Sequence, residues 1–212
     1  MSTHARGERR RLAALLEEAG PQAPTLCEGW TAADLAAHLV VRERRPDAAP
    51  GILFRPLAGW TAKVQGEYAA RPYPELLELV RTGPGRRSLF ALPGADEAAN
   101  TVEFFVHAED VRRAAPDWKP EPVDPELAEA LWKRLPMPAR MEAGRRSPVG
   151  LVLRRPDGQT VVARKGAPVV TVVGEPAELL LFAFGRGAHT TVTPEGDPDV
   201  IALLSAALPL PA

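Results

Sequence analysis

The stretch Leu26–Arg45, LCEGWTAADLAAHLVVRERR, decides the fold of the N-terminal half, because it contains a clear helix start followed by an apolar face. Thr31 is a favourable N-cap residue, and Asp34, three residues later, can return a capping-box hydrogen bond. Pro46 disfavours helical backbone in the residue before it. The sequence therefore predicts a helix over residues 32–45.

A second informative stretch, Val102–Val111 (VEFFVHAEDV), belongs to a longer helix expected over residues 95–115. Its apolar side chains recur at helical spacing, and Asp96 and Asn100 are candidate caps near its start. The N-terminal half is thus expected to be helical, with three further helices at residues 4–19, 57–68 and 74–81.

The two helices together offer three candidate metal ligands. Glu103 and His107 are four residues apart, so both side chains project from one face of their helix. His38 lies next to Leu39 and three residues after Leu35, so it should face the interior rather than water. Two histidines and one carboxylate leave a coordination position open on zinc, as in catalytic sites. The alternative is a weak surface pair together with a hydrogen-bonded core histidine.

The chain changes character after residue 115. Four prolines fall within Ala115–Pro125, so residues 1–115 and 126–212 are expected to form two domains joined by a linker at residues 116–125. The C-terminal part alternates short strands and helices, and Asp157-Gly158 is a favourable hairpin turn. Strands are expected at residues 149–154, 159–164, 168–173 and 189–193, and helices at 126–135, 176–184 and 198–208. This pattern indicates a small α+β domain.

Composition excludes several classes of function. The chain of 212 residues has 26 basic and 27 acidic residues, and its arginine pairs are scattered, so no nucleic-acid partner is expected. The apolar stretches are too short for a membrane span, the N-terminus has no apolar signal segment, and the single cysteine, Cys27, cannot form an internal disulfide. We expect a soluble cytoplasmic protein, either a monomer or a homodimer.

The motifs resemble a known family. Leu26–His38 is similar to the opening motif of the mycothiol-dependent maleylpyruvate isomerase family, which belongs to the DinB-like metalloenzyme superfamily, and Val102–Val111 is similar to its second metal motif. Arg44–Ile52 resembles an actinobacterial subgroup known only as metal-binding proteins. The C-terminal half, including Leu179–Arg186, resembles the sterol-carrier-like domain of the same family.

The resemblance implies a fold, a site and a chemistry. The fold would be a DinB-like four-helix bundle followed by the α+β domain, with zinc or another divalent metal on His38, Glu103 and His107. Mycothiol would be the co-substrate of an isomerase or transferase acting on a small electrophilic molecule, and Arg186 would bind a substrate carboxylate. Two other functions stay open: a metal- or thiol-binding protein without turnover, and an apolar-ligand carrier in which the metal is structural.

Several other residues have weaker claims to the site. Asp34 could support His38 but is better explained as a cap. Asp110 could orient a metal ligand or pair with a neighbouring arginine, and Cys27 has no flanking cation that would make it reactive. Arg186 lies between two glycines after a helix, where charge compensation of the helix C-terminus explains it equally well. His189 is expected to be structural.

Overall fold

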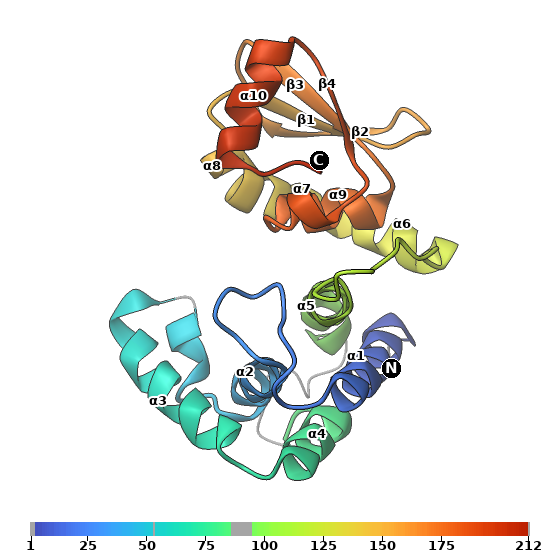
Figure 1. The fold of residues 1–212 in the computed structure, drawn as a ribbon. Coiled ribbons are helices and arrows are strands. Elements are labelled where there is room, and N and C mark those ends of the chain that lie inside the picture. Colours follow the sequence, from blue (N-terminus) through green and yellow to red (C-terminus); the bar gives the residue numbers. More distant parts are fainter. Residues whose placement is uncertain (1–2, 53, 86–94, 212) are drawn as a thin grey trace. The chain divides into compact units, whose positions relative to one another are not determined.

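The computed structural model describes residues 3–52, 54–85 and 95–211 of the chain. These residues form two compact units, Met1–Trp118 and Lys119–Ala212 (Figure 1). The first unit is helical and the second combines helices with one sheet, in agreement with the change of pattern in the sequence.

The first unit contains five α-helices and two short 3-10 turns within the described residues. They are α1 (Thr3–Ala19), α2 (Ala32–Arg44), η1 (Ala49–Ile52), η2 (Arg55–Leu57), α3 (Ala58–Ala69), α4 (Tyr73–Thr82) and α5 (Ala95–Arg112). All five predicted helices are therefore confirmed. Among the residues that the structure describes, no helix is both long enough and apolar enough to cross a membrane.

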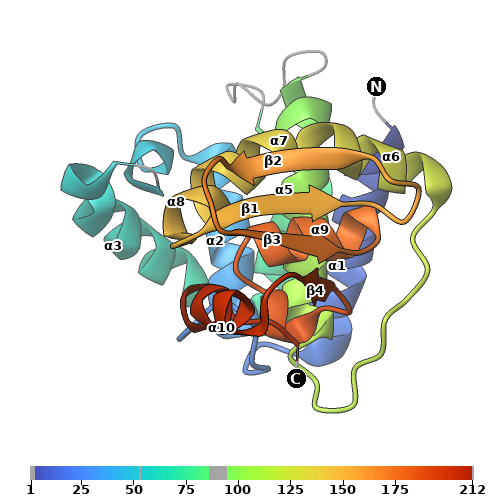
Figure 2. The ribbon, with the colours of Figure 1, turned by 90° about the horizontal axis from the view of Figure 1, so that it is seen from above.

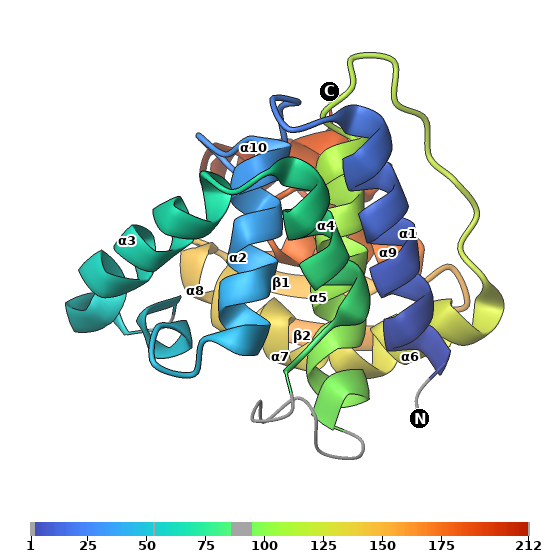
Figure 3. The same ribbon diagram turned by 90° about the horizontal axis from the view of Figure 1, so that it is seen from below.

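Helix α2 begins as its sequence predicts. The Asp34 amide donates to the Thr31 hydroxyl at 3.3 Å, and the Thr31 amide donates to the Asp34 carboxylate at 2.9 Å, which completes the capping box. Asp34 is thus explained by the cap. Helices α1, α2, α4 and α5 lie side by side (Figure 3) and share one apolar core. That core includes Leu12, Leu16, Leu35, Leu39, Leu76 and Phe104, all at most 1% exposed.

Helix α5 corrects one sequence expectation. The helix begins at Ala95, so Asn100 lies inside it rather than at a cap. The Asn100 side chain is fully buried and donates to the Glu43 carboxylate of α2 at 2.9 Å. The side-chain amide of Asn100 thus joins α5 to α2. The periodicity of α5 alone could not identify a partner on another helix. The side chain of Asp96, the other expected cap, lies outside the described part of the chain.

The second unit is built around a four-stranded sheet with the order β2-β1-β3-β4 (Figure 2). Strand β1 pairs antiparallel with β2 and parallel with β3, and β3 pairs antiparallel with β4. Helix α6 packs against α9, whose eight residues are all buried. The elements are α6 (Pro125–Arg134), α7 (Pro136–Pro138), η4 (Ala139–Ala143), α8 (Gly144–Arg146), β1 (Gly150–Arg154), β2 (Thr160–Arg164), β3 (Val169–Val173), α9 (Pro176–Ala183), η5 (Gly187–His189), β4 (Thr193–Glu195) and α10 (Pro198–Ala207).

The structure differs from the sequence analysis at two places in the second unit. Residues 136–146, to which no element was assigned, are helical throughout. The predicted strand at residues 189–193 is also displaced, because η5 occupies its start and β4 begins only at Thr193. At η5, the His189 amide donates to the Arg186 carbonyl at 2.8 Å, so a local turn takes the backbone groups that a strand would pair.

Candidate metal centre

Helices α2 and α5 bring three predicted ligand side chains together. One carboxylate oxygen of Glu103, Oε1, lies 3.4 Å from His38 Nε2 and 3.4 Å from His107 Nε2. The ligand atoms of the three side chains all lie within 4.8 Å of one another. The side chains of His38 and His107 are 10% and 12% exposed, and that of Glu103 is 25% exposed, so the group is largely buried.

The distances are those that a metal site would have. Ligands about 2.0–2.2 Å from a tetrahedral zinc ion lie roughly 3.3–3.6 Å from one another. Both 3.4 Å spacings fall in this range, and the same contacts are long hydrogen bonds between the histidines and Glu103. Two imidazoles and a carboxylate are also donors that zinc accepts.

Asp110 sets the orientation of the His107 imidazole. Its carboxylate oxygen Oδ2 lies 2.9 Å from His107 Nδ1, a hydrogen-bond distance, and its side chain is fully buried. When Nδ1 carries the proton, Nε2 keeps a free lone pair directed at Glu103 and His38. Of the two roles considered for Asp110, orientation of a ligand is the one that its contact supports.

Polar residues that the sequence analysis missed surround Glu103. Arg42 Nε lies 3.3 Å from Glu103 Oε1, and the Arg42 guanidinium also donates to the side-chain oxygen of Asn100. Asn100 in turn donates to Glu43, whose carboxylate accepts two hydrogen bonds of 2.6 Å from Arg9. Helical spacing could have indicated Arg42 as a neighbour of the site, because it is four residues after His38 and lies on the same face of α2.

The electrostatics of the centre favour an ionised Glu103 beside a protonated His107. Burial alone would raise the pKa of Glu103, but hydrogen bonds from the two histidines and nearby positive charge hold that pKa well below its usual value. Burial would lower the pKa of His107, yet hydrogen bonds to Asp110, Cys27 and Glu103 raise it well above its usual value. A divalent ion bound at His107 Nε2 would therefore have to displace a proton from that imidazole.

The other residues singled out in the sequence are Arg186, His189 and Cys27. Arg186 belongs to the second unit, where its Nη1 donates to the carbonyl of Phe184 at 2.8 Å, directly after α9. This contact fits charge compensation at a helix C-terminus, and its role toward a substrate remains a prediction. His189 lies in η5 and Cys27 lies beside His107, with 3.9 Å between Cys27 Sγ and His107 Nδ1. The sequence analysis did not predict that Cys27 would lie beside His107.

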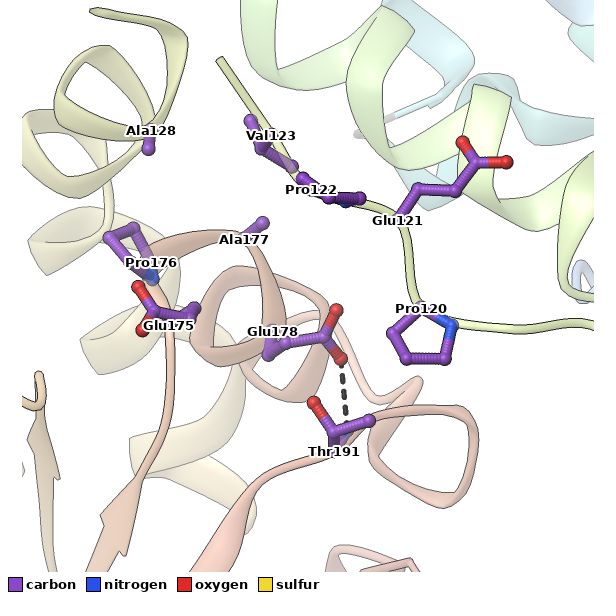
Figure 4. Close-up of a pocket in the computed structure, with 10 residues that line it drawn as sticks. All are labelled: Pro120, Glu121, Pro122, Val123, Ala128, Glu175, Pro176, Ala177, Glu178 and Thr191. Carbon is purple, nitrogen blue, oxygen red and sulfur yellow. Dashed lines mark hydrogen bonds between the residues drawn. The ribbon is translucent and has the colours of Figure 1, made fainter. Parts of the chain in front are cut away.

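The second unit has a pocket of its own, with a volume of about 440 Å³ (Figure 4). Glu121, Glu175 and Glu178 are among its lining residues, and Glu178 accepts a hydrogen bond of 2.9 Å from the Thr191 amide. In Figure 4 the Glu121 side chain points away from the other lining residues. The volume suits a small ligand. The pocket is lined by Pro120, Glu121, Pro122, Val123, Ala128, Glu175, Pro176, Ala177, Glu178 and Thr191.

Comparisons with known proteins agree with this description. Residues 3–137 match the family of the mycothiol maleylpyruvate isomerase N-terminal domain. Two solved structures, a mycothiol-dependent maleylpyruvate isomerase and its histidine-to-alanine variant, are similar with TM-scores of 0.55 and 0.61. Each is 18% identical in sequence, and each comparison covers 90% of both chains. At this identity the likeness shows the fold alone. No curated protein matches the chain.

Proposed function

The chain belongs to the family of the mycothiol maleylpyruvate isomerase N-terminal domain, and on this basis we propose that it is a zinc-dependent enzyme that uses mycothiol. Its reaction would be an isomerisation or a sulfur transfer on a small electrophilic metabolite. In this proposal His38, Glu103 and His107 hold the ion. The observation that supports it best is the pair of 3.4 Å spacings between Glu103 Oε1 and the two imidazole nitrogens.

The surrounding residues suit this chemistry. Zinc held by two imidazoles and one carboxylate keeps a position for a further ligand and favours the thiolate form of a thiol at neutral pH. Asp110 keeps the proton of His107 at Nδ1, and Arg42 orients Glu103. The chemistry that a bound zinc ion would supply is a mycothiol thiolate able to act as a nucleophile toward an electrophilic carbon of the substrate.

The proposal extends to the second unit. Arg186 would bind a carboxylate of the substrate, for which a planar guanidinium offers two parallel donors that lysine lacks. We further propose a DinB-like bundle at residues 1–115, a linker at residues 116–125, and a sterol-carrier-like domain at residues 126–212. The shared core of α1, α2, α4 and α5 and the four-stranded sheet with its helices support these assignments.

Metal analysis of the purified protein is the first test. We expect about one zinc ion per chain in the parent, and loss of zinc in His38→Ala and in His107→Ala with unchanged helical content. His189→Ala, which removes a histidine of the second unit, is the matched control and should retain zinc. Full zinc occupancy in both ligand variants would show that the site assignment is wrong.

Thiol binding is tested on the cobalt-substituted protein. A thiolate ligand gives an intense charge-transfer band in the near ultraviolet, which oxygen and nitrogen ligands lack. Mycothiol should produce this band in the parent protein and not in Glu103→Ala, which cannot hold the metal. An unchanged cobalt spectrum at saturating mycothiol would favour a metal-binding protein without thiol chemistry.

A carrier of an apolar ligand is the weaker alternative. The pocket in the second unit has a suitable volume, but Glu121, Glu175 and Glu178 are among its lining residues. A neutral apolar ligand that co-purifies with the protein would support the carrier function. Mass spectrometry of an organic extract of the purified protein detects such a ligand.

A further inference from the structure

The loop before α2 lies against the candidate metal centre. The Leu26 amide donates to the Asp110 carbonyl at 3.0 Å, which ties the loop to α5. Within the loop, the Thr25 hydroxyl donates to the Trp30 carbonyl at 2.9 Å and accepts a hydrogen bond of 3.2 Å from the Cys27 amide. The loop is therefore held in one conformation by its own bonds and by its bond to α5.

The loop presents one side chain to each histidine of the centre. The Trp30 ring lies 5.0 Å from the His38 ring, measured between centroids. Cys27 Sγ lies 3.2 Å from Asp110 Oδ2, the oxygen that is also 2.9 Å from His107 Nδ1. One buried carboxylate oxygen thus faces two donors, the Cys27 thiol and the His107 imidazole.

We propose that Cys27 is a positioning residue of the metal centre. Its thiol donates to Asp110 Oδ2 and holds that oxygen against His107 Nδ1, so that His107 Nε2 stays directed at Glu103 and His38. This inference rests on the proposed metal site and deepens it. It gives a role to a cysteine for which the sequence analysis found none.

The geometry favours this role over direct metal ligation by Cys27. Cys27, His107 and Asp110 also have their ligand atoms within 4.8 Å of one another. However, the 2.9 Å distance between His107 Nδ1 and Asp110 Oδ2 is that of a hydrogen bond, whereas two ligands of one zinc ion lie roughly 3.3–3.6 Å apart. The imidazole of His107 therefore presents Nε2 to the ion and Nδ1 to Asp110.

Two substitutions of Cys27 separate hydrogen bonding from packing. Cys27→Ala removes the donor, whereas Cys27→Ser keeps an O–H donor at the same position. Loss of one such hydrogen bond should weaken zinc affinity about 3- to 10-fold in Cys27→Ala, and Cys27→Ser should restore affinity to within about twofold of the parent. Competition with a chromophoric zinc chelator, in the presence of a non-thiol reductant, measures the three affinities.

A second measurement follows the hydrogen bond itself. In the zinc-loaded parent, the Nδ1 proton of His107 should be visible and slow to exchange by nuclear magnetic resonance. It should exchange faster in Cys27→Ala and stay protected in Cys27→Ser, which a purely structural loss of packing would not produce.

The outcomes distinguish this inference from the proposed function. If the parent binds zinc and all three proteins share one affinity and one exchange rate, the role of Cys27 is overturned while the metal site stands. If Cys27→Ser is as weak as Cys27→Ala, the thiol acts as a ligand or by packing, and the inference also fails. If the parent binds no zinc, the metal site and the role of Cys27 are both refuted.

Discussion

Glu43→Gln should destabilise the first unit strongly, because Glu43 is the hub of a buried polar network. The Glu43 side chain is 2% exposed, and its two oxygens accept hydrogen bonds of 2.6 Å from Arg9 and one of 2.9 Å from Asn100. Glutamine has nearly the same shape, but it lacks the charge and places an NH₂ group against one of these donors. The Arg9 guanidinium, whose side chain is 7% exposed, would lose its carboxylate partner.

The expected loss in free energy of unfolding is about 3 kcal/mol. Breaking a buried ion pair on one side costs roughly 3–5 kcal/mol, and the remaining glutamine oxygen places this case at the lower end. Such a loss lowers the melting temperature by roughly 10 °C. Glu17→Gln is the matched control, because Glu17 pairs with Arg81 at 2.5 Å while its side chain is 62% exposed, and it should cost less than about 0.5 kcal/mol.

Urea denaturation, followed by far-ultraviolet circular dichroism, measures both variants. The double variant Arg9→Met, Glu43→Leu removes both charges and should recover most of the lost stability, since apolar residues can replace a buried ion pair. If Glu43→Gln stays within about 0.5 kcal/mol of the parent, the reasoning that the pair is buried and coupled is refuted. Both variants and the parent are measured without metal, because an ion bound to the folded state would add to the measured stability.

Three further predictions concern the fold, the linker and the proposed reaction. Tyr73→Phe removes a hydroxyl that donates to the Leu16 carbonyl at 2.7 Å and should cost about 1 kcal/mol. Burial and then the charge of Glu17 raise the pKa of Tyr73 to about 12. The phenol therefore ionises first in the unfolded chain, and the parent should lose stability as the pH rises from about 10 to 12. Denaturation at alkaline pH should show that Tyr73→Phe lacks this loss. A protease of broad specificity should cut first within residues 116–125, as fragment masses will show. Arg186→Lys should reduce mycothiol-dependent turnover at least tenfold with unchanged zinc content, as assays of activity and metal on the same sample will show.

The helices of the first unit were predictable because their signals are local. The cap at Thr31 and the apolar spacing of α5 act within one or two turns of the chain. The sequence analysis assigned no structure to residues 136–146, where the helical backbone includes Pro136 and Pro138. Proline lacks only an N–H that the first turn of a helix does not use, so both residues fit at the start of a new turn.

The candidate ligands were predictable for a similar reason, and their surroundings were not. The faces of His38 and of the Glu103–His107 pair follow from helical geometry. Arg42 could also have been found, since it lies one turn after His38 on the same face. Cys27 could not, because it lies in a loop, and the partner of a loop side chain depends on tertiary structure.

The centre and the core use different residues, and this separation decides how ligand variants should behave. The apolar core of the first unit consists of leucines, alanines, valines and Phe104, and it does not include His38 or His107. Replacing a ligand histidine by alanine therefore removes few core contacts. It should lower zinc affinity more than it lowers the free energy of unfolding. Glu43 is the opposite case, because it anchors Asn100, which accepts from Arg42 next to Glu103. Glu43→Gln should thus weaken both stability and zinc affinity, while His38→Ala should abolish zinc binding with little change in stability, because Glu103 keeps Arg42 as its partner. If both variants lose stability to the same extent, the centre is part of the folding core and the two functions of these helices cannot be separated.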